Sequence, residues 1–143
     1  MNAQKFMTFR VNLERKQNNP VAQATVRDFS LPLGIISGDF SFGFNPAETL
    51  LSAAAACLTS AFILVAKNSQ VDVGNINVEM EGVRQSDPPR LISLNYRVFV
   101  ETEASDEKID TLLKLATRNS TVVSTLSQVL ELNGEWKRYK NGN

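Results

Sequence analysis

The chain has 143 residues, 15 Lys and Arg against 15 Asp and Glu, a single cysteine and no histidine. Its length suits one domain over 1–143 with a core of its own, and its balanced charge favours neither nucleic acid nor an anionic membrane as a partner. Without histidine there is no Ser-His-Asp or Cys-His nucleophile and no His-ligated metal, and one cysteine cannot complete a structural zinc site. We therefore expect no metal and no cofactor, and we expect any chemistry to involve Cys57.

The expected location of the protein is the cytoplasm. A lone cysteine fits a reducing compartment. Residues 1–10 alternate between polar and apolar side chains instead of forming the apolar stretch of a signal peptide.

Two strands are expected before the middle of the chain. From 7 to 14, apolar and polar residues alternate, as in a strand with one buried face. The sequence KQNNP at 16–20 predicts a turn, after which 21–31 forms a weaker strand that pairs back on the first as a hairpin. Pro32 and Gly34 are expected to end this strand.

The loop at 34–44 carries phenylalanines at every second position, Phe40, Phe42 and Phe44. In one interpretation they pack beneath the start of the helix that follows. In the other they form an aromatic wall for an apolar ligand. The sequence favours the first interpretation and leaves the second open.

The longest apolar stretch, between Leu50 and Ala66, has no charge, glycine or proline. It predicts a helix over about 46–68 that is apolar nearly all round and therefore buried on most sides. Asn45 can cap this helix, and Glu48 three residues later completes a capping-box pattern. The stretch is shorter than the roughly 20 apolar residues of a membrane span and is rich in alanine, so we expect a core helix and no membrane.

The second half of the chain mixes strands and helices. Period-two alternation predicts two strands. After them we expect a capped amphipathic helix, a short helical segment and a last strand. Asn119 and Ser120 separate the two helical segments. In chain order these five elements lie at 76–81, 92–101, 105–118, 121–127 and 130–136.

The order of elements favours an α+β class with antiparallel pairing, because strands that are neighbours in the sequence tend to pair. A small sheet cannot by itself surround a helix that is apolar on every face. A second copy of the chain would cover the remainder. We therefore expect an intertwined homodimer.

The sequence NPAETLLSAAAAC, which runs from Asn45 to Cys57, resembles the helix-opening motif of the OsmC/Ohr family of osmotically inducible and organic hydroperoxide resistance proteins. In that family the reactive cysteine also lies twelve residues after the asparagine. The resemblance continues through VDVGNINVEMEGV, PPRLISLNYRVFVE and SDEKIDTLLKLA, and thus covers nearly the whole chain. It implies an OsmC-like fold, an antiparallel sheet wrapped around a buried central helix in an intertwined dimer.

The resemblance also implies a reaction. In the family's peroxidases a cysteine thiolate attacks the peroxide bond and becomes a sulfenic acid, which a second cysteine then resolves as a disulfide. Cys57 matches the first cysteine, whereas Ser120 stands where the second would be. Any turnover would therefore need an external reductant, such as a small thiol or dithiol.

Two further family roles transfer less directly. The peroxidases have a catalytic glutamate two residues after the asparagine, where this chain has Ala47, and some relatives carry it one place later, as Glu48 does. Nine residues before Cys57, Glu48 would lie about half a turn round the helix, so it either caps the helix or acts on a partner subunit. The family's thiolate partner is an upstream arginine, for which Arg27 is the candidate, with Arg10 and Arg15 as alternatives.

Two functions remain open at this point. The chain is either a one-cysteine peroxidase that reduces organic hydroperoxides, with the phenylalanines of 34–44 forming an apolar pocket, or a non-catalytic protein that binds a small apolar ligand in the dimer cavity. A lone cysteine with apolar neighbours can also be a small core residue. The family spacing of Cys57 supports a reactive thiol, whereas Ser120 and Ala47 count against one, so both interpretations of Cys57 stay open.

Overall fold

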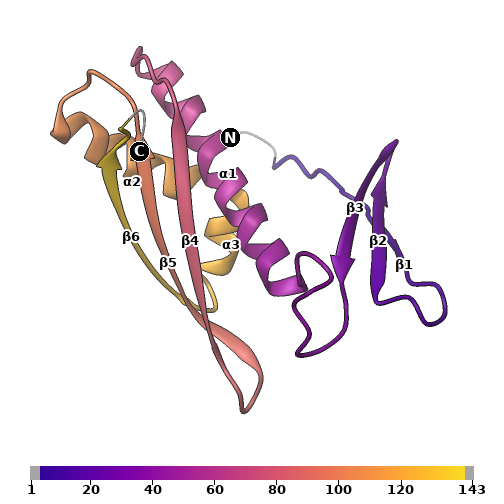
Figure 1. Cartoon of the computed structure of the whole chain (residues 1–143). Helices are drawn as coiled ribbons and strands as arrows, with labels where there is room; N and C mark the ends of the chain where they lie inside the picture. The colour runs from indigo at the N-terminus through magenta and orange to yellow at the C-terminus, as the bar shows by residue number, and fades with distance from the viewer. Residues whose placement is uncertain (1–3, 141–143) are drawn as a thin grey trace. The chain divides into compact units, whose positions relative to one another are not determined.

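The computed structural model describes residues 4–140, which form nine elements in the order β1, β2, β3, α1, β4, β5, α2, α3, β6 (Figure 1). The chain divides into two compact units, Met1–Thr49 and Leu50–Asn143. Helix α1, Pro46–Asn68, begins in the first unit and continues into the second. The mixed α+β class predicted from the sequence is confirmed, whereas the single domain over 1–143 stays a prediction.

The first unit contains an antiparallel sheet of three strands, β1 (Asn12–Glu14), β2 (Val21–Val26) and β3 (Phe29–Gly34), in that order. The predicted hairpin between the first two strands is confirmed, but the single strand expected at 21–31 is in fact two strands. A tight turn separates them, with Arg27 at a positive φ of 52°. Pro32 is tolerated inside β3 because that strand lies at the edge of the sheet, where a missing N–H donor costs little.

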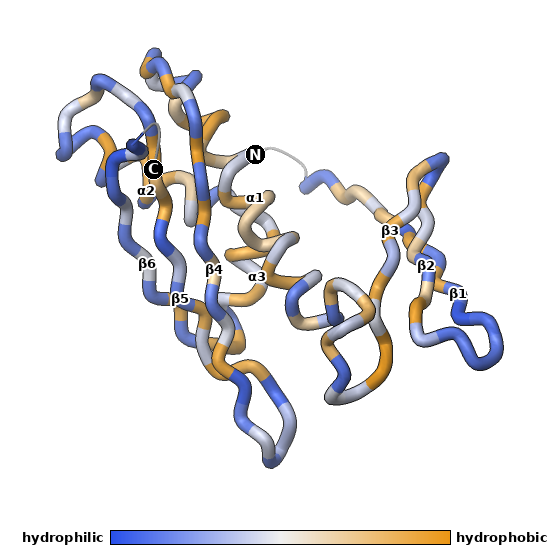
Figure 2. Tube along the Cα trace, in the orientation of Figure 1, coloured by the Kyte–Doolittle hydropathy of each residue, from blue (hydrophilic) through white to orange (hydrophobic). Residues whose placement is uncertain are grey.

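The apolar face predicted for 7–14 is not buried within this unit. Only Asn12–Glu14 pair in the sheet, and Phe9 remains 80% exposed. The other apolar residues of this stretch, and Phe6 just before it, are also more than half exposed; within the stretch they are Met7, Val11 and Leu13. The alternation is therefore present in the sequence (Figure 2), but the first unit has no layer of its own that covers it.

The second unit contains a sheet in the order β4 (Ile76–Gln85), β5 (Arg90–Val100) and β6 (Glu131–Arg138). Strands β4 and β5 are antiparallel, as expected, but β5 and β6 are parallel. The expectation of purely antiparallel pairing was wrong here because the chain crosses over through two helices before it returns as β6, and such a crossover joins parallel strands. Those helices are α2 (Asp106–Asn119) and α3 (Thr121–Leu126).

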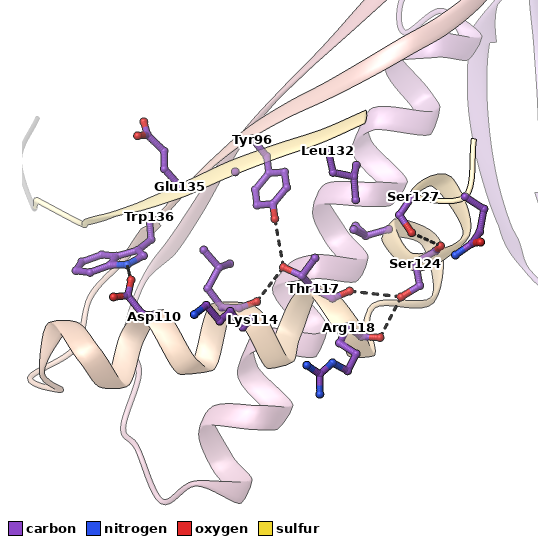
Figure 3. A pocket seen from close by; sticks show the side chains of 14 residues that line it. Tyr96, Asp110, Lys114, Thr117, Arg118, Ser124, Ser127, Leu132, Glu135 and Trp136 are labelled. Carbon is purple, nitrogen blue, oxygen red and sulfur yellow. Dashed lines mark hydrogen bonds between the residues drawn. The ribbon is translucent and has the colours of Figure 1, made fainter. Parts of the chain in front are cut away.

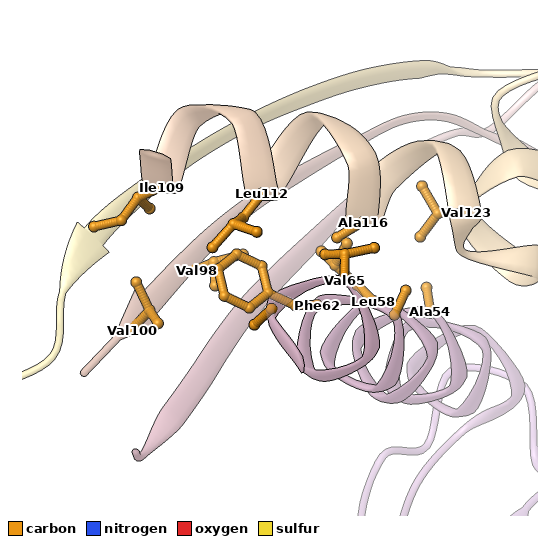
Figure 4. Packing of buried hydrophobic residues seen from close by; sticks show 12 residues of the cluster. Ala54, Leu58, Phe62, Val65, Val98, Val100, Ile109, Leu112, Ala116 and Val123 are labelled. Atoms are coloured by element: carbon orange, nitrogen blue, oxygen red, sulfur yellow. The ribbon is translucent and has the colours of Figure 1, made fainter. Parts of the chain in front are cut away.

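The core of the second unit lies where α1, α2, α3 and β5 meet (Figure 4). The predicted apolar stripe of α2 is buried, since Ile109, Leu112 and Ala116 are 0% exposed. They pack in one cluster with residues of the other three elements, which include Ala54, Leu58, Phe62, Val65, Val98, Val100 and Val123. This cluster fixes α1 and the start of α3 against each other.

Helix α1 is buried along one face only. Residues such as Leu58 and Phe62 are enclosed, whereas Ile63 and Leu64 are 51% and 55% exposed. The expectation of burial on most sides is therefore not met within one chain, because the single layer of β5 and α2 covers one side of the helix. By length and composition α1 could cross a membrane, a test that the core helix of a soluble protein also passes.

Candidate functional site

The one cysteine, Cys57, lies in the middle of α1 as a half-buried free thiol. Its neighbours in the helix, Ala54 and Leu58, are fully buried in the cluster that also holds Val123 of α3 (Figure 4). The turn of α1 that carries the thiol is thus packed against the beginning of α3. The resemblance to the OsmC/Ohr family implied this proximity, because Ser120 stands where the family's second cysteine would meet the first.

Ser120 ends α2 and begins α3. Its backbone is extended, with φ −81° and ψ 112°, which breaks the helical path as the sequence predicted. Its side chain is 0% exposed, and its Oγ accepts a hydrogen bond from Val123 N–H at 3.4 Å. Ser120 is therefore the N-cap of α3.

Three groups at the start of α3 act on the sulfur of Cys57 and lower its pKa. They are the Ser120 hydroxyl and the backbone N–H groups of Val122 and Thr121. The first N–H groups of a helix have no partner within it and are free to donate elsewhere. The sulfur thus faces three neutral donors, all supplied by one short segment.

These contacts set the ionisation of the thiol. Burial raises the pKa of Cys57, but the hydrogen bonds from the Ser120 side chain and from the backbone of Val122 and Thr121 together lower it by more. The net pKa of Cys57 is below the ordinary value for a thiol, because each donor binds the thiolate better than the neutral S–H. A larger fraction of the protein therefore carries the nucleophilic form.

The donors at the start of α3 were missed from the sequence. Cys57 lies too deep in α1 for the positive end of its own helix to reach it, and the family resemblance pointed to an upstream arginine as the partner of the thiolate. The serine that interrupts the helical pattern at 119–120 is an N-cap signal, and it marked a helix start with free N–H groups. It did not show that these groups meet Cys57.

Glu48 forms the predicted capping box. Its carboxylate accepts from Asn45 N–H at 3.1 Å, and the Asn45 side chain accepts from Glu48 N–H at 2.7 Å. These bonds satisfy backbone donors at the start of α1. Of the two roles left open for Glu48, the structure shows the cap, and action on a partner subunit stays a prediction.

Arg27 belongs to the first unit, in the turn between β2 and β3. Its guanidinium lies 5.8 Å from the centre of the Phe29 ring, a cation–π distance. Of the two alternative arginines, Arg15 donates to Asn19 O at 3.0 Å, and Arg10 lies outside the strands. The role of Arg27 as a partner of the thiolate remains a prediction.

The three phenylalanines of the loop after β3 are exposed. Phe40, Phe42 and Phe44 are 72%, 39% and 57% exposed. Within the first unit these side chains are therefore not buried beneath the start of α1, contrary to the first interpretation. Exposed aromatic side chains remain available to a ligand or to another copy of the chain.

A groove of about 800 Å³ lies between α2, α3 and β6 (Figure 3). None of the predicted site residues lines it, and several of its polar groups bond to one another: Tyr96 Oη to Thr117 Oγ1 at 3.2 Å, and Trp136 Nε1–H to the carboxylate of Asp110. A Cβ on Gly134 would come within 2.1 Å of the Tyr96 ring. Glycine there lets Tyr96 cross β6 to reach α2, so the groove is explained by packing.

No group of three or more His, Cys, Asp or Glu residues within 4–140 is arranged to hold a metal ion. The groups that the structure brings to Cys57 are the three at the start of α3.

Residues 37–133, about two thirds of the chain, match the family model for OsmC-like proteins. The chain belongs to the OsmC-like family. The matched region contains the motif at Asn45, Cys57 and the start of α3. The resemblance seen in the sequence is thereby confirmed.

Solved structures of OsmC-like proteins share the fold. An OsmC-like protein from Mycoplasma pneumoniae superposes with a TM-score of 0.85 at 18% identity, covering 94% of this chain and 99% of that one. The organic hydroperoxide resistance protein OhrB of Bacillus subtilis gives 0.64 at 18% identity, with 90% and 98% covered. One from Legionella pneumophila gives 0.72 at 14% identity, with 94% and 99% covered. No curated protein sequence matches this OsmC-like chain.

Proposed function

We propose that this OsmC-like protein reduces organic hydroperoxides through the thiolate of Cys57. The observation that carries the proposal is the set of three donors from α3, which lowers the pKa of a half-buried thiol that burial alone would raise. A merely structural cysteine needs no such donors. The two relatives described above as organic hydroperoxide resistance proteins support the choice of substrate class.

The reaction follows from the chemistry of the thiolate. The sulfur attacks the outer oxygen of the hydroperoxide, an S–O bond forms, and the O–O bond breaks with its electron pair passing to the alkoxide. The alkoxide takes a proton from water and leaves as an alcohol. Sulfur is oxidised by two electrons to the sulfenic acid, and the peroxide is reduced by two.

The reductant comes from outside the chain, because Cys57 has no second cysteine with which to form a disulfide. An external thiol displaces the hydroxyl of the sulfenic acid as water and forms a mixed disulfide. A second thiol, or the other sulfur of a dithiol, then releases Cys57 in its reduced form. We propose that this cycle takes place in the cytoplasm.

We further propose that the protein is a homodimer. Helix α1 leaves Ile63 and Leu64 exposed, and the first unit leaves Phe9 and the phenylalanines of 34–44 exposed. Apolar surface on this scale marks an association site, and a second copy would bury it. In the dimer these phenylalanines would contribute to an apolar wall for the organic part of the substrate.

Arg27 stays the candidate for an additional cation at the thiolate. A slower alkylation of Cys57 in Arg27→Ala would support that role. An unchanged rate would remove Arg27 from the site.

The proposal is tested by mass spectrometry of the reduced protein after one equivalent of an organic hydroperoxide and a sulfenic-acid trap. We expect rapid trapping at Cys57 and none in Cys57→Ser. The control is a free small thiol in the same tube. If that thiol is oxidised while Cys57 stays unmodified, the proposed reaction does not occur.

The exposed phenylalanines favour a second function, in which the OsmC-like fold binds a small apolar ligand without turnover. Saturable binding of such a ligand that is unchanged in Cys57→Ser, together with no consumption of peroxide, would support this function over the first.

A further inference from the structure

We propose that Ser120 is a positioning residue for the reactive sulfur: its hydroxyl donates to Cys57 Sγ while its oxygen accepts from Val123 N–H. Ser120 matters for turnover if Cys57 is the peroxidatic residue proposed above. Its contact with the sulfur can be tested without any peroxide. The two proposals can therefore fail separately.

The burial of Ser120 gives the first reason. It is 0% exposed. Among the residues that the structure describes, it is the one polar residue that is buried. Burying a hydroxyl costs free energy unless it is hydrogen-bonded. No buried polar side-chain atom within residues 4–140 lacks a partner, so the Ser120 hydroxyl is satisfied where it lies.

The hydrogen-bond capacity of a hydroxyl gives the second reason. Serine has one proton to donate and two lone pairs that accept. Val123 N–H occupies a lone pair, which leaves the proton for the sulfur in contact with Ser120. A Ser120 hydroxyl whose proton points at the sulfur favours the thiolate form of Cys57, because a thiolate accepts a hydrogen bond better than a neutral thiol does.

The packing of α1 against α3 gives the third reason. Ala54 and Leu58 lie on either side of Cys57 along the helix and share a buried cluster with Val123, three residues after Ser120 (Figure 4). The backbones of the two segments are thus held by apolar contacts that do not involve the sulfur. Removing the Ser120 hydroxyl leaves this scaffold in place.

The donors to Cys57 are all neutral. The groups that lower its pKa belong to Ser120, Val122 and Thr121, and the remaining contribution is its own burial. No charged side chain of α1 or α3 enters. The thiolate is therefore held by oriented dipoles, and a neutral site of this kind depends on the exact placement of each donor.

The test measures the rate at which iodoacetamide alkylates Cys57 across pH, in the wild type and in Ser120→Ala. We expect the variant to react about tenfold more slowly at neutral pH, because it lacks one hydrogen bond to a charged acceptor. We also expect the midpoint of its pH profile to move upward, a change that a merely structural role would not produce. Superimposable profiles for the two proteins would overturn the proposal.

The control is Ser105→Ala. Ser105 is the N-cap of α2 and accepts from Lys108 N–H at 3.2 Å, the same capping bond that Ser120 makes to Val123. Both substitutions remove a cap, but only Ser120 contacts the sulfur, so Ser105→Ala should keep the wild-type pH profile. An equal shift in Ser105→Ala would show that loss of a cap, and not of the donor, is responsible.

Two further variants cover the case in which Ser120→Ala does not fold. Ser120→Gly removes the hydroxyl while glycine still serves as an N-cap, and we expect it to show the same slow alkylation. Ser120→Thr keeps a hydroxyl and should restore the wild-type profile. Wild-type behaviour of Ser120→Gly would contradict the proposal as directly as that of Ser120→Ala.

Discussion

The two compact units of the chain use apolar residues in different ways. In the second unit, Phe62, Leu112 and Val98 are almost fully enclosed by α1, α2 and β5. In the first unit, Phe9 and Phe40 are exposed to solvent, and among the apolar residues that the structure describes there only Ala22 and Leu33 are buried. An apolar pattern in a sequence thus shows which residues will be covered, but not whether the same chain covers them.

The largest expected effect is on the free energy of unfolding, and it appears when one phenylalanine from each unit is replaced by alanine and the two variants are compared. Phe62→Ala should lower the free energy of unfolding by about 3–5 kcal/mol, because it opens a cavity in a closed core. Phe9→Ala should change it by less than about 0.5 kcal/mol in dilute protein, because Phe9 is 80% exposed in one chain.

Urea unfolding at low and at higher protein concentration checks both values. If a second copy covers the first unit, the loss caused by Phe9→Ala should grow with protein concentration, whereas that of Phe62→Ala should stay constant. Similar losses for the two variants at low concentration would contradict the difference between the units.

An intermediate effect is expected at the exposed face of α1. Leu64→Glu places a charge on a side chain that is 55% exposed in one chain and that we propose to be buried in the dimer. It should weaken dimerisation by at least about tenfold, because burial of an unpaired charge is costly.

Light scattering after size-exclusion chromatography measures this weakening, and Thr111→Glu on the exposed side of α2 provides a new charge away from the proposed interface. A wild-type protein that is monomeric at all concentrations would disprove the dimer.

The smallest expected effect concerns the thiol and pH. The pKa of Cys57 is lowered in the folded state, so folding favours the thiolate. The resulting stability is absent at acidic pH and is fully present above the pKa of an unfolded cysteine, about 8.5. The difference in unfolding free energy between wild type and Cys57→Ser should therefore increase as pH rises from neutral through that value.

Urea unfolding of both proteins under reducing conditions at several pH values measures this difference. A difference that stays flat or shrinks with rising pH would show that the donors of α3 do not favour the thiolate.

Local pattern determined several elements directly from the sequence. The capping box of Asn45 and Glu48 marked the start of α1, and the spacing of Ile109, Leu112 and Ala116 predicted the buried stripe of α2. Such signals lie within a few residues of each other, where backbone geometry alone fixes which groups meet. The position of Cys57 relative to Asn45 indicated the family in the same way.

Tertiary structure decided the rest. The crossover through α2 and α3 made β6 parallel to β5, and the packing of Val123 against α1 brought Ser120 to Cys57. Residues so far apart along the chain meet only because apolar burial folds distant segments together, and no local pattern carries that information. The sequence by itself thus determined the helix and the position of its cysteine, whereas the donors that lower the pKa of this cysteine come together only in the folded chain.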